Sequence, residues 1–236
     1  DALRLQNLGT VDEPRSTNAN PGALTVAAMV GLAYDAKRME PSWITELGAA
    51  SVASTHGDAE AFLSGAVLAN VIAGIVREPQ KALKEQFLLA IEAMDNRYRM
   101  QFDQAAGIAA KLKLALQLPV ADERQTMEDL VCDTASQCLA GAMYACLVSQ
   151  GDFDTAMITA VNHSGRSAAV GALAGAILGA KLGSDALPEF YLEGLEVVQV
   201  LTELAKDLSQ GSPTMGLFDD DWDQKYTQGM PVGNYL

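Results

Sequence analysis

Aromatic residues are scarce in this sequence: phenylalanine, tryptophan and tyrosine make up 6% of its 236 residues, while hydrophobic residues make up 49%. A β-sandwich favours aromatic and β-branched residues, so this composition argues against one. The chain also shows no βαβ alternation, no convincing strand and no independent repeat. Its abundant alanine and glycine indicate closely packed helices, and its length suits one large core. We therefore predict an all-α fold with a single domain over 1–236.

Positive charge is also scarce. The 16 lysines and arginines stand against 30 aspartates and glutamates, which gives a formal net charge of −14. The phosphate backbone of a nucleic acid needs a basic protein face, so we expect no nucleic-acid partner. A single nucleotide-like ligand stays open, because the N-terminus of a helix can bind phosphate without any net positive charge.

Cysteine is limited to Cys132, Cys138 and Cys146, all within one predicted helical segment. An odd number without metal-ligand spacing is not a disulfide framework, and a reduced cytoplasm is the simpler location. The first residues lack the order of a signal peptide, and the longest apolar run, Ala168–Ala180, is too short to span a bilayer. We expect a soluble cytoplasmic protein with buried thiols and no membrane partner.

The two ends of the chain differ from its middle. Residues 1–21 are polar and contain Pro14 and Pro21, which predicts an extended arm. Residues 211–236 are acidic and rich in turn residues, which predicts a tail. Asp219–Asp223 is the dense carboxylate cluster of the sequence, but its spacing fits no EF-hand loop. We expect a solvated tail there and no cation site.

Small residues recur every fourth position in two predicted helices. The helix over 58–77, with Thr55 as its expected cap, should form a shallow groove into which another helix can settle. Its small residues are Ala61, Gly65, Ala69 and Ala73. The second set is Gly171, Gly175, Gly179 and Gly183. Each of these glycines weakens a helix by about 1 kcal/mol relative to alanine, so we expect their face to be buried against neighbouring helices. Other helices are expected over 22–39, from a Ser42 cap, and over 81–94, 97–116, 128–147, 152–160 and 184–208.

The motifs that carry chemistry lie between 160 and 193. An Ala160-Val161-Asn162 run leads through Gly165 and Ser167 into the glycine-rich helix, and Leu187–Glu193 reads Leu-Pro-Glu-Phe-Tyr-Leu-Glu. This order resembles the C-terminal region of ADP-ribosylglycohydrolases. Weaker matches are Asn20–Leu24 and Thr55-His56. The resemblance covers about four-fifths of the chain in outline, and it implies a compact orthogonal helical bundle of that family's type.

Two departures from the family change what the resemblance implies. The family's second metal-binding motif has aspartates at the positions of Arg166 and Ala168, and a hydroxyl group at the position of Ala169. Magnesium needs oxygen ligands, which alanine lacks, and arginine places a permanent cation there. The family's Thr-Asp-Asp triplet and the Gly-Asp-Ala-Leu-Gly helix before it occur nowhere in the chain, as if the sequence began after them. We expect no magnesium cofactor, although the family implies one.

The candidate ligand site is the loop before the glycine-rich helix. Free N–H groups at 167–170 could receive a phosphate, with Arg166 adding a cation. The alternative is a capping loop whose Ser164 and Ser167 satisfy the same donors. His163 and His56 are expected to be structural, and no catalytic residue is identified. The candidate residues are Asn162, His163, Ser164, Gly165, Arg166 and Ser167.

Three functions stay open from the sequence. The chain could be a relative of the ADP-ribosylglycohydrolases that has lost metal-dependent hydrolysis and still binds ADP-ribose or a related nucleotide. It could also be an active glycohydrolase that cleaves the bond at the anomeric ribose carbon, or a structural protein that uses only the bundle. The loss of metal ligands at Arg166 and Ala168 favours the first and the last. The oligomeric state cannot be inferred from these residues.

Overall fold

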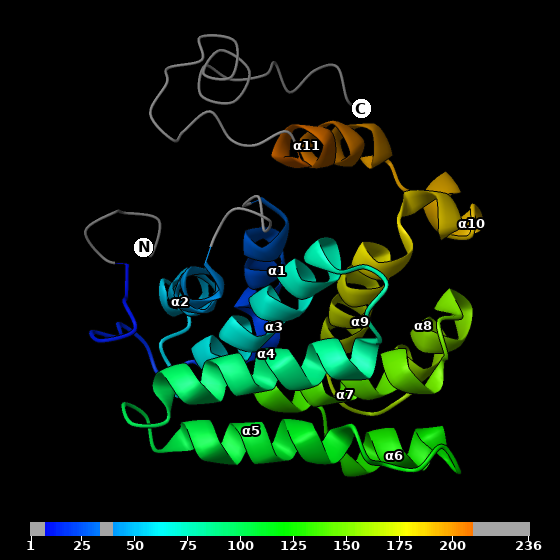
Figure 1. The fold of residues 1–236 in the computed structure, drawn as a ribbon. Coiled ribbons are helices and arrows are strands. Elements are labelled where there is room, and N and C mark those ends of the chain that lie inside the picture. Colours follow the sequence, from blue (N-terminus) through cyan, green and yellow to red (C-terminus); the bar gives the residue numbers. More distant parts are fainter. Residues whose placement is uncertain (1–7, 34–39, 210–236) are drawn as a thin grey trace, which may run out of the picture.

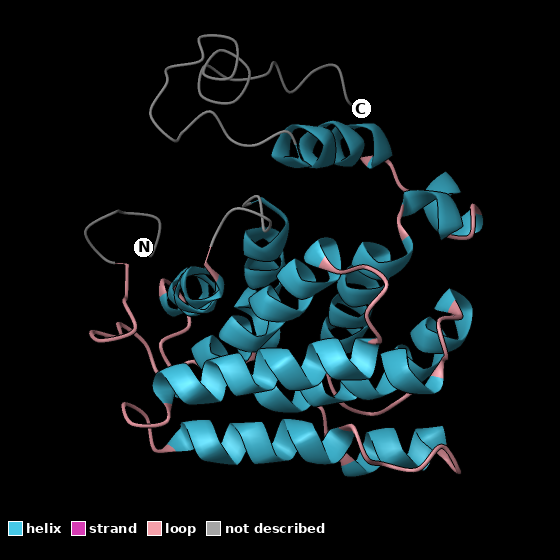
Figure 2. Ribbon diagram, viewed as in Figure 1, coloured by secondary structure: helices cyan, strands magenta, loops and turns pink. Residues whose placement is uncertain are grey.

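A computed structural model describes residues 8–33 and 40–209, and every regular element in these ranges is helical (Figures 1 and 2). The predicted all-α fold is therefore confirmed. The predicted acidic tail, with Asp219–Asp223, lies outside the described residues, as do residues 1–7 of the predicted arm. The longer helices are α1 (Leu24–Ala33), α2 (Pro41–Ala53), α3 (Ala59–Arg77), α4 (Leu83–Tyr98), α5 (Gln104–Ala115), α7 (Ala135–Val148), α9 (Ser167–Leu182) and α11 (Val198–Ser209). The shorter ones are η2 (Pro21–Ala23), α6 (Glu123–Asp129), α8 (Phe153–Val161), η3 (Ser184–Ala186) and α10 (Phe190–Glu193).

The helix α3 is the centre of the fold. It packs against α1, α2, α4, α5, α7 and α9, and most of its side chains are buried. It is long and apolar enough to cross a membrane by length and composition alone, but 78% of it is buried inside the protein. That burial is typical of a core helix, whose apolar surface is covered by its neighbours.

The small residues of α3 form the predicted groove, and α2 lies in it. A Cβ atom added to Gly65 would come within 2.5 Å of Val52 Cγ2, and one added to Gly48 would come within 2.6 Å of Ala69 Cβ. Gly31 brings α1 equally close, since a Cβ atom there would lie 2.7 Å from the Ala69 carbonyl oxygen. The three helices approach closely because these positions carry no side chain.

The glycine face of α9 is buried less than predicted, although a Cβ atom added to Gly171 would lie 2.9 Å from Val161 Cγ1 of α8. Its buried residues lie on another face, which includes Leu173, Ala174 and Ile177. Gly175 and Gly179 are only half buried, and a Cβ atom added to Gly179 would meet nothing within 4 Å among the described residues. The spacing permits close approach, but here no helix makes use of it at Gly179.

Several predicted helix boundaries are wrong for local reasons. The helix predicted over 128–147 is broken, because Val131 and Cys132 adopt φ angles of 64° and 48°, which no helix accommodates. The helix predicted over 184–208 is divided into η3, α10 and α11. At the start of α2, Pro41 occupies the first turn and Glu40 precedes it, so Ser42 is not the cap.

The three cysteines are buried free thiols, as predicted. Burial raises the pKa of Cys132 and of Cys138 to about 12, and it also raises the pKa of Cys146. At neutral pH all three are therefore protonated, and none is activated as a nucleophile.

Candidate functional site

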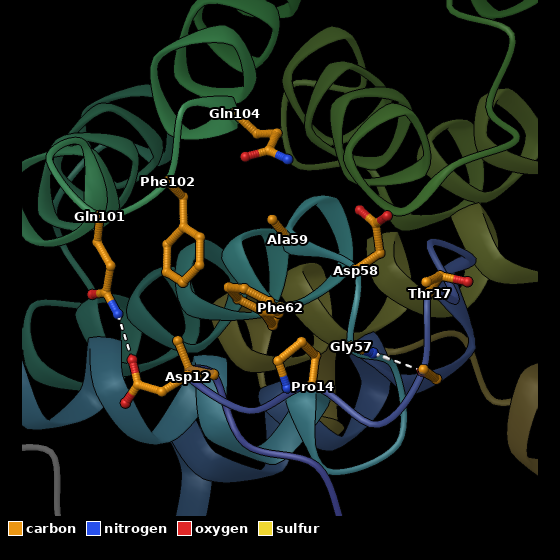
Figure 3. Close-up of a pocket in the computed structure, with 12 residues that line it drawn as sticks. Asp12, Pro14, Thr17, Gly57, Asp58, Ala59, Phe62, Gln101, Phe102 and Gln104 are labelled. Carbon is orange, nitrogen blue, oxygen red and sulfur yellow. Dashed lines mark hydrogen bonds between the residues drawn. The ribbon is translucent and has the colours of Figure 1, made fainter.

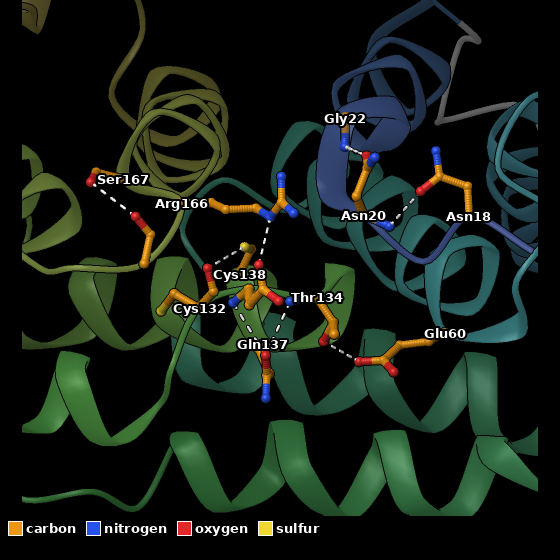
Figure 4. A network of polar contacts seen from close by, with 12 residues as sticks. Asn18, Asn20, Gly22, Glu60, Cys132, Thr134, Gln137, Cys138, Arg166 and Ser167 are labelled. Carbon is orange, nitrogen blue, oxygen red and sulfur yellow. Dashed lines mark hydrogen bonds and ion pairs between the residues drawn. The ribbon is translucent and has the colours of Figure 1, made fainter.

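Arg166 lies at the point where the loop from α8 enters α9 (Figure 4). Its backbone N–H donates to the Cys132 carbonyl oxygen at 2.9 Å, and its Nε donates to Asp133 Oδ1 at 2.9 Å. The side chains of Arg166 and Asp133 are 50% and 63% exposed, so this ion pair is at the surface. The Arg166 side chain is thus held through Nε, while the two terminal guanidinium nitrogens stay accessible.

Gly165 explains why the loop fits against the segment that joins α6 to α7. A Cβ atom at this position would lie 2.3 Å from the Val131 carbonyl oxygen and 2.9 Å from Cys132 Cβ. Only glycine avoids these contacts, most of which are with backbone or Cβ atoms that cannot swing away. The loop and the 130–134 segment are therefore packed backbone to backbone.

His163 is buried and closes the loop from inside. Its Nδ1 accepts a hydrogen bond from the Gly165 N–H at 3.1 Å, so the proton is on Nε2, which donates to the Ala160 carbonyl oxygen at 3.0 Å. Both ring nitrogens are used within the chain. The geometry agrees with a structural histidine.

The remaining polar side chains of the loop also bond within the protein. The Ser164 N–H donates to Glu128 Oε1 at 3.1 Å and its hydroxyl donates to Glu128 Oε2, and these bonds lower the pKa of Glu128. Asn162 Nδ2 donates to the Ile158 carbonyl oxygen at 2.7 Å, and the Ser167 hydroxyl donates to the His163 carbonyl oxygen at 3.2 Å. Neither serine caps α9, which contradicts the alternative of a capping loop.

The expectation of free N–H groups at the start of α9 is also wrong in large part. The Ser167 N–H donates to the Gly165 carbonyl oxygen, and the N–H groups of Ala169 and Val170 both donate to the Arg166 carbonyl oxygen. Three of the four predicted anion donors are thus used in the tight turn itself. The chain turns so sharply into α9 that carbonyl groups of the loop reach them.

The loop before η2, which contains Ala19 and Asn20, lies against the start of α7. The Ala135 N–H donates to the Ala19 carbonyl oxygen at 2.9 Å. The next residue, Asn20, accepts hydrogen bonds at Oδ1 from the Gly22 N–H at 2.9 Å and from His56 Nε2 at 3.0 Å. The weaker sequence match at 20–24 and the stronger one at 160–167 therefore both adjoin the start of α7.

His56 connects that loop to the start of α3. Its Nδ1 accepts from the Thr55 hydroxyl at 2.9 Å, while its Nε2 donates to Asn20. Partial burial lowers the pKa of His56 below its ordinary value. Thr55 therefore does not cap α3 as predicted; the cap is Asp58, which accepts from the Glu60 N–H at 2.8 Å. His56 fixes the loop, as the sequence indicated.

Glu60 is the polar centre that the sequence analysis missed. Its Oε1 accepts from Ser136 Oγ at 2.5 Å and from Lys111 Nζ at 3.2 Å. It also accepts from the Thr134 hydroxyl (Figure 4). Burial alone would raise its pKa, but these donors outweigh burial and the pKa is lowered. The ionised carboxylate thus joins α3, α5 and α7. The capping-box spacing of Thr134 and Gln137 could have located the start of α7, but no sequence signal indicates that Glu60 accepts from the residues there.

The donor set at this site does not fit magnesium. Arg166 presents a cation already paired with Asp133, and Ala168 and Ala169 have no side-chain oxygen. The described residues also contain no group of three or more histidine, cysteine, aspartate or glutamate side chains that could hold a metal ion.

A pocket of about 550 Å³ lies beside the start of α3, and no residue of the 162–167 loop lines it (Figure 3). Phe62 and Phe102 meet edge to face there, with ring centroids 5.1 Å apart. Asp12 accepts a hydrogen bond from Gln101 Nε2 at 2.6 Å at its rim. Asp58, the cap of α3, also lines the pocket.

Comparison with known proteins identifies the relatives of this chain. A family model described as ADP-ribosylglycohydrolase matches residues 2–216. A protein of Archaeoglobus fulgidus, itself described only as uncharacterized, is 28% identical over 188 residues, which are 79% of this chain and 57% of that protein. The chain therefore spans just over half the length of that relative.

Proposed function

Because the chain belongs to the ADP-ribosylglycohydrolase family, we propose that it binds ADP-ribose or a related nucleotide and does not carry out metal-dependent hydrolysis. The observation that supports this most is the side chain of Arg166. It stands where the family has a metal-binding aspartate, at the start of α9, half exposed and held by Asp133. A permanent cation at this position favours a phosphate group and disfavours a metal ion.

Arg166 has donors to offer a ligand. Its Nε is used by Asp133, whereas its two terminal nitrogens have no partner among the described residues. A guanidinium group with both terminal nitrogens available can bind a phosphate through two parallel hydrogen bonds. The backbone of the loop is fixed by Gly165 and His163, so little conformational entropy would be lost on binding.

The neighbouring loop extends the proposed surface. Asn18 and Asn20 each use their amide oxygen within the loop, through the Asn20 and Gly22 N–H groups. Their amide nitrogens have no acceptor among the residues that the structure describes, and Figure 4 shows both residues on the loop near Arg166. These donors suit the hydroxyl and phosphate oxygens of a nucleotide.

Hydrolysis is the part of the family's chemistry that we propose is lost. In the family a pair of metal ions positions substrate and water, and the carboxylates that would bind one of them are replaced here by Arg166 and Ala168. Arg166 can hold charge on a bound diphosphate, which stabilises the complex. Stabilising the bound substrate and the transition state equally does not speed bond cleavage.

The test is calorimetric titration of the chain with ADP-ribose, with and without magnesium. We expect binding that magnesium leaves unchanged and that Arg166→Ala weakens by about tenfold or more, since hydrogen bonds to a charged group are being removed. The matched control is Arg124→Ala on α6, which removes an exposed arginine of the same charge from outside the loop. Equal affinity for the Arg166→Ala variant and the unmodified chain would refute the role of Arg166. Absence of binding to either would favour a purely structural protein.

A further inference from the structure

A groove of about 460 Å³ lies between α5, α6 and α7, away from the 162–167 loop. Its volume lies within the usual range for small-molecule sites, and most of its lining is apolar. The apolar lining residues are Leu114, Ala115, Leu118, Pro119, Leu130, Val131 and Ala140. Leu114 is 61% exposed and Val131 is 53% exposed, so large apolar side chains stand open to water at its mouth.

One polar side chain in this groove has donors to spare. Gln137 Oε1 accepts from the N–H groups of Asp133 at 3.2 Å and Thr134 at 3.0 Å, as the capping box of α7 requires. Its Nε2 has no acceptor among the described residues, and Figure 4 shows this nitrogen turned away from those contacts. Because the oxygen is held by the cap, the amide cannot flip, and the nitrogen of this lining residue is left to donate to a ligand.

The charged side chains of the groove both have partners within the protein. Lys111 and Asp129 are its two charged lining residues. Lys111 Nζ donates to Ser136 Oγ at 2.7 Å and pairs with Glu60, and Asp129 Oδ1 accepts from Gln125 Nε2 at 2.8 Å. Glu60 offsets the charge of Lys111, and the remaining carboxylate of Asp129 disfavours an anion. The mainly apolar lining disfavours an ion of either sign, which favours an uncharged ligand.

The wall of the groove at Leu130 and Val131 is fixed before any ligand arrives. Val131 is β-branched and has a φ of 64°, a conformation that such residues rarely adopt unless their surroundings impose it. The next residue, Cys132, accepts at its carbonyl oxygen from the Arg166 N–H, and Gly165 packs against the Val131 carbonyl oxygen. The groove therefore shares this segment with the 162–167 loop.

We propose that this groove is a second ligand site, which takes an uncharged, mainly apolar small molecule carrying one carbonyl-type hydrogen-bond acceptor. The apolar body lies against Leu114, Leu118 and Val131, and the acceptor receives the N–H of Gln137 Nε2. No residue of the 162–167 loop lines this groove and its test does not use ADP-ribose, so the proposal stands or falls separately from the proposed function.

The test uses acetophenone as the probe and ethylbenzene as the hydrocarbon analogue that lacks the acceptor, followed through the methyl NMR signals of leucine and valine. We expect acetophenone to shift the signals of Leu114, Leu118 and Val131, and ethylbenzene to bind about five- to tenfold more weakly. Gln137→Glu keeps the capping oxygen but removes the donor, so it should weaken acetophenone by a similar factor. Gln117→Glu, an exposed glutamine outside the groove, is the control and should bind as the unmodified chain does.

Three results would overturn the proposal. Absence of shifts at these methyl groups, or equal binding of acetophenone and ethylbenzene, overturns the proposal. So does unchanged affinity in a folded Gln137→Glu variant. If that variant does not fold, Leu114→Glu places a charge in the groove without touching the capping box, and it must abolish the shifts at Leu118 and Val131 for the proposal to stand.

Discussion

The helices α3 and α9 carry the same four-residue spacing of small residues and use it differently. In α3, Gly65 lies so close to α2 that an added Cβ atom would come within 2.5 Å of Val52 Cγ2. In α9, an added Cβ atom at Gly171 would lie 2.9 Å from Val161 Cγ1 and one at Gly175 would lie 4.0 Å from Met157 Sδ. A Cβ atom at Gly179 would meet nothing within 4 Å among the described residues. Identical spacing thus forms a tight helix contact in one region and a partly open face in the other.

A small-residue pattern therefore predicts that a helix can be approached closely, and it does not predict that a neighbour does so. Close packing also requires a neighbouring helix whose own surface fits against the small residues. On α3 the neighbours are α1 and α2, whose own glycines Gly31 and Gly48 face it. On α9 the buried contacts use Leu173 and Ile177 on another face.

The largest change in stability is expected for a substitution in the tight contact between α2 and α3. Gly65→Ala should lower the free energy of unfolding by about 1–3 kcal/mol, because the new methyl group would overlap Val52 and approach the Gly48 carbonyl oxygen. This loss should appear although alanine is the better helix former. Urea denaturation measures it, and an unchanged unfolding midpoint would mean that α2 and α3 are not in close contact.

The same substitution on α9 should have the opposite sign. Gly179→Ala should raise the free energy of unfolding by about 0.5–1 kcal/mol, since alanine restricts the unfolded chain and meets no neighbour in the described structure. It serves as the matched control for Gly65→Ala. A loss of stability here would show that something does pack on the glycine face of α9.

A smaller effect concerns the loop before α3. Burial lowers the pKa of His56, so the folded protein binds a proton there less readily than the unfolded chain does. The contribution of this group to stability is therefore complete above a pH of about 6.5 and is lost as the pH falls below it. His56→Gln, whose amide nitrogen can still donate to Asn20, should flatten the fall in melting temperature between about pH 7 and pH 5. An unaltered pH profile in that variant would exclude His56 as its source.

The sequence predicted the fold class and the position of most helices because helical periodicity is a local signal. The helix over 58–77 matches α3 within one residue at its start. The break at Val131 and Cys132 was missed, although the capping-box spacing of Thr134 and Gln137 marks a helix start directly after it. The left-handed conformation of Val131 and Cys132 occurs where Gly165, much later in the chain, packs against the Val131 carbonyl oxygen. Long-range packing overrides local propensity at such points.

The candidate site was predicted in part. The sequence located the 162–167 loop and identified the unusual Arg166, but it could not show that Asp133 would pair with that arginine. It also missed Glu60, whose partners Lys111 and Ser136 lie 51 and 76 residues away in the chain. Partners this far apart are brought together by tertiary packing, so only the structure reveals them.

The central claim is that this member of the ADP-ribosylglycohydrolase family binds without hydrolysing. The most direct measurement is release of ADP-ribose from ADP-ribosyl-arginine, ADP-ribosyl-serine and O-acetyl-ADP-ribose by the unmodified chain, in the presence and absence of magnesium. We predict no release above the uncatalysed rate under either condition, because the loss of metal charge removes several kcal/mol of transition-state stabilisation. Magnesium-stimulated release of ADP-ribose from any of the three would contradict this account.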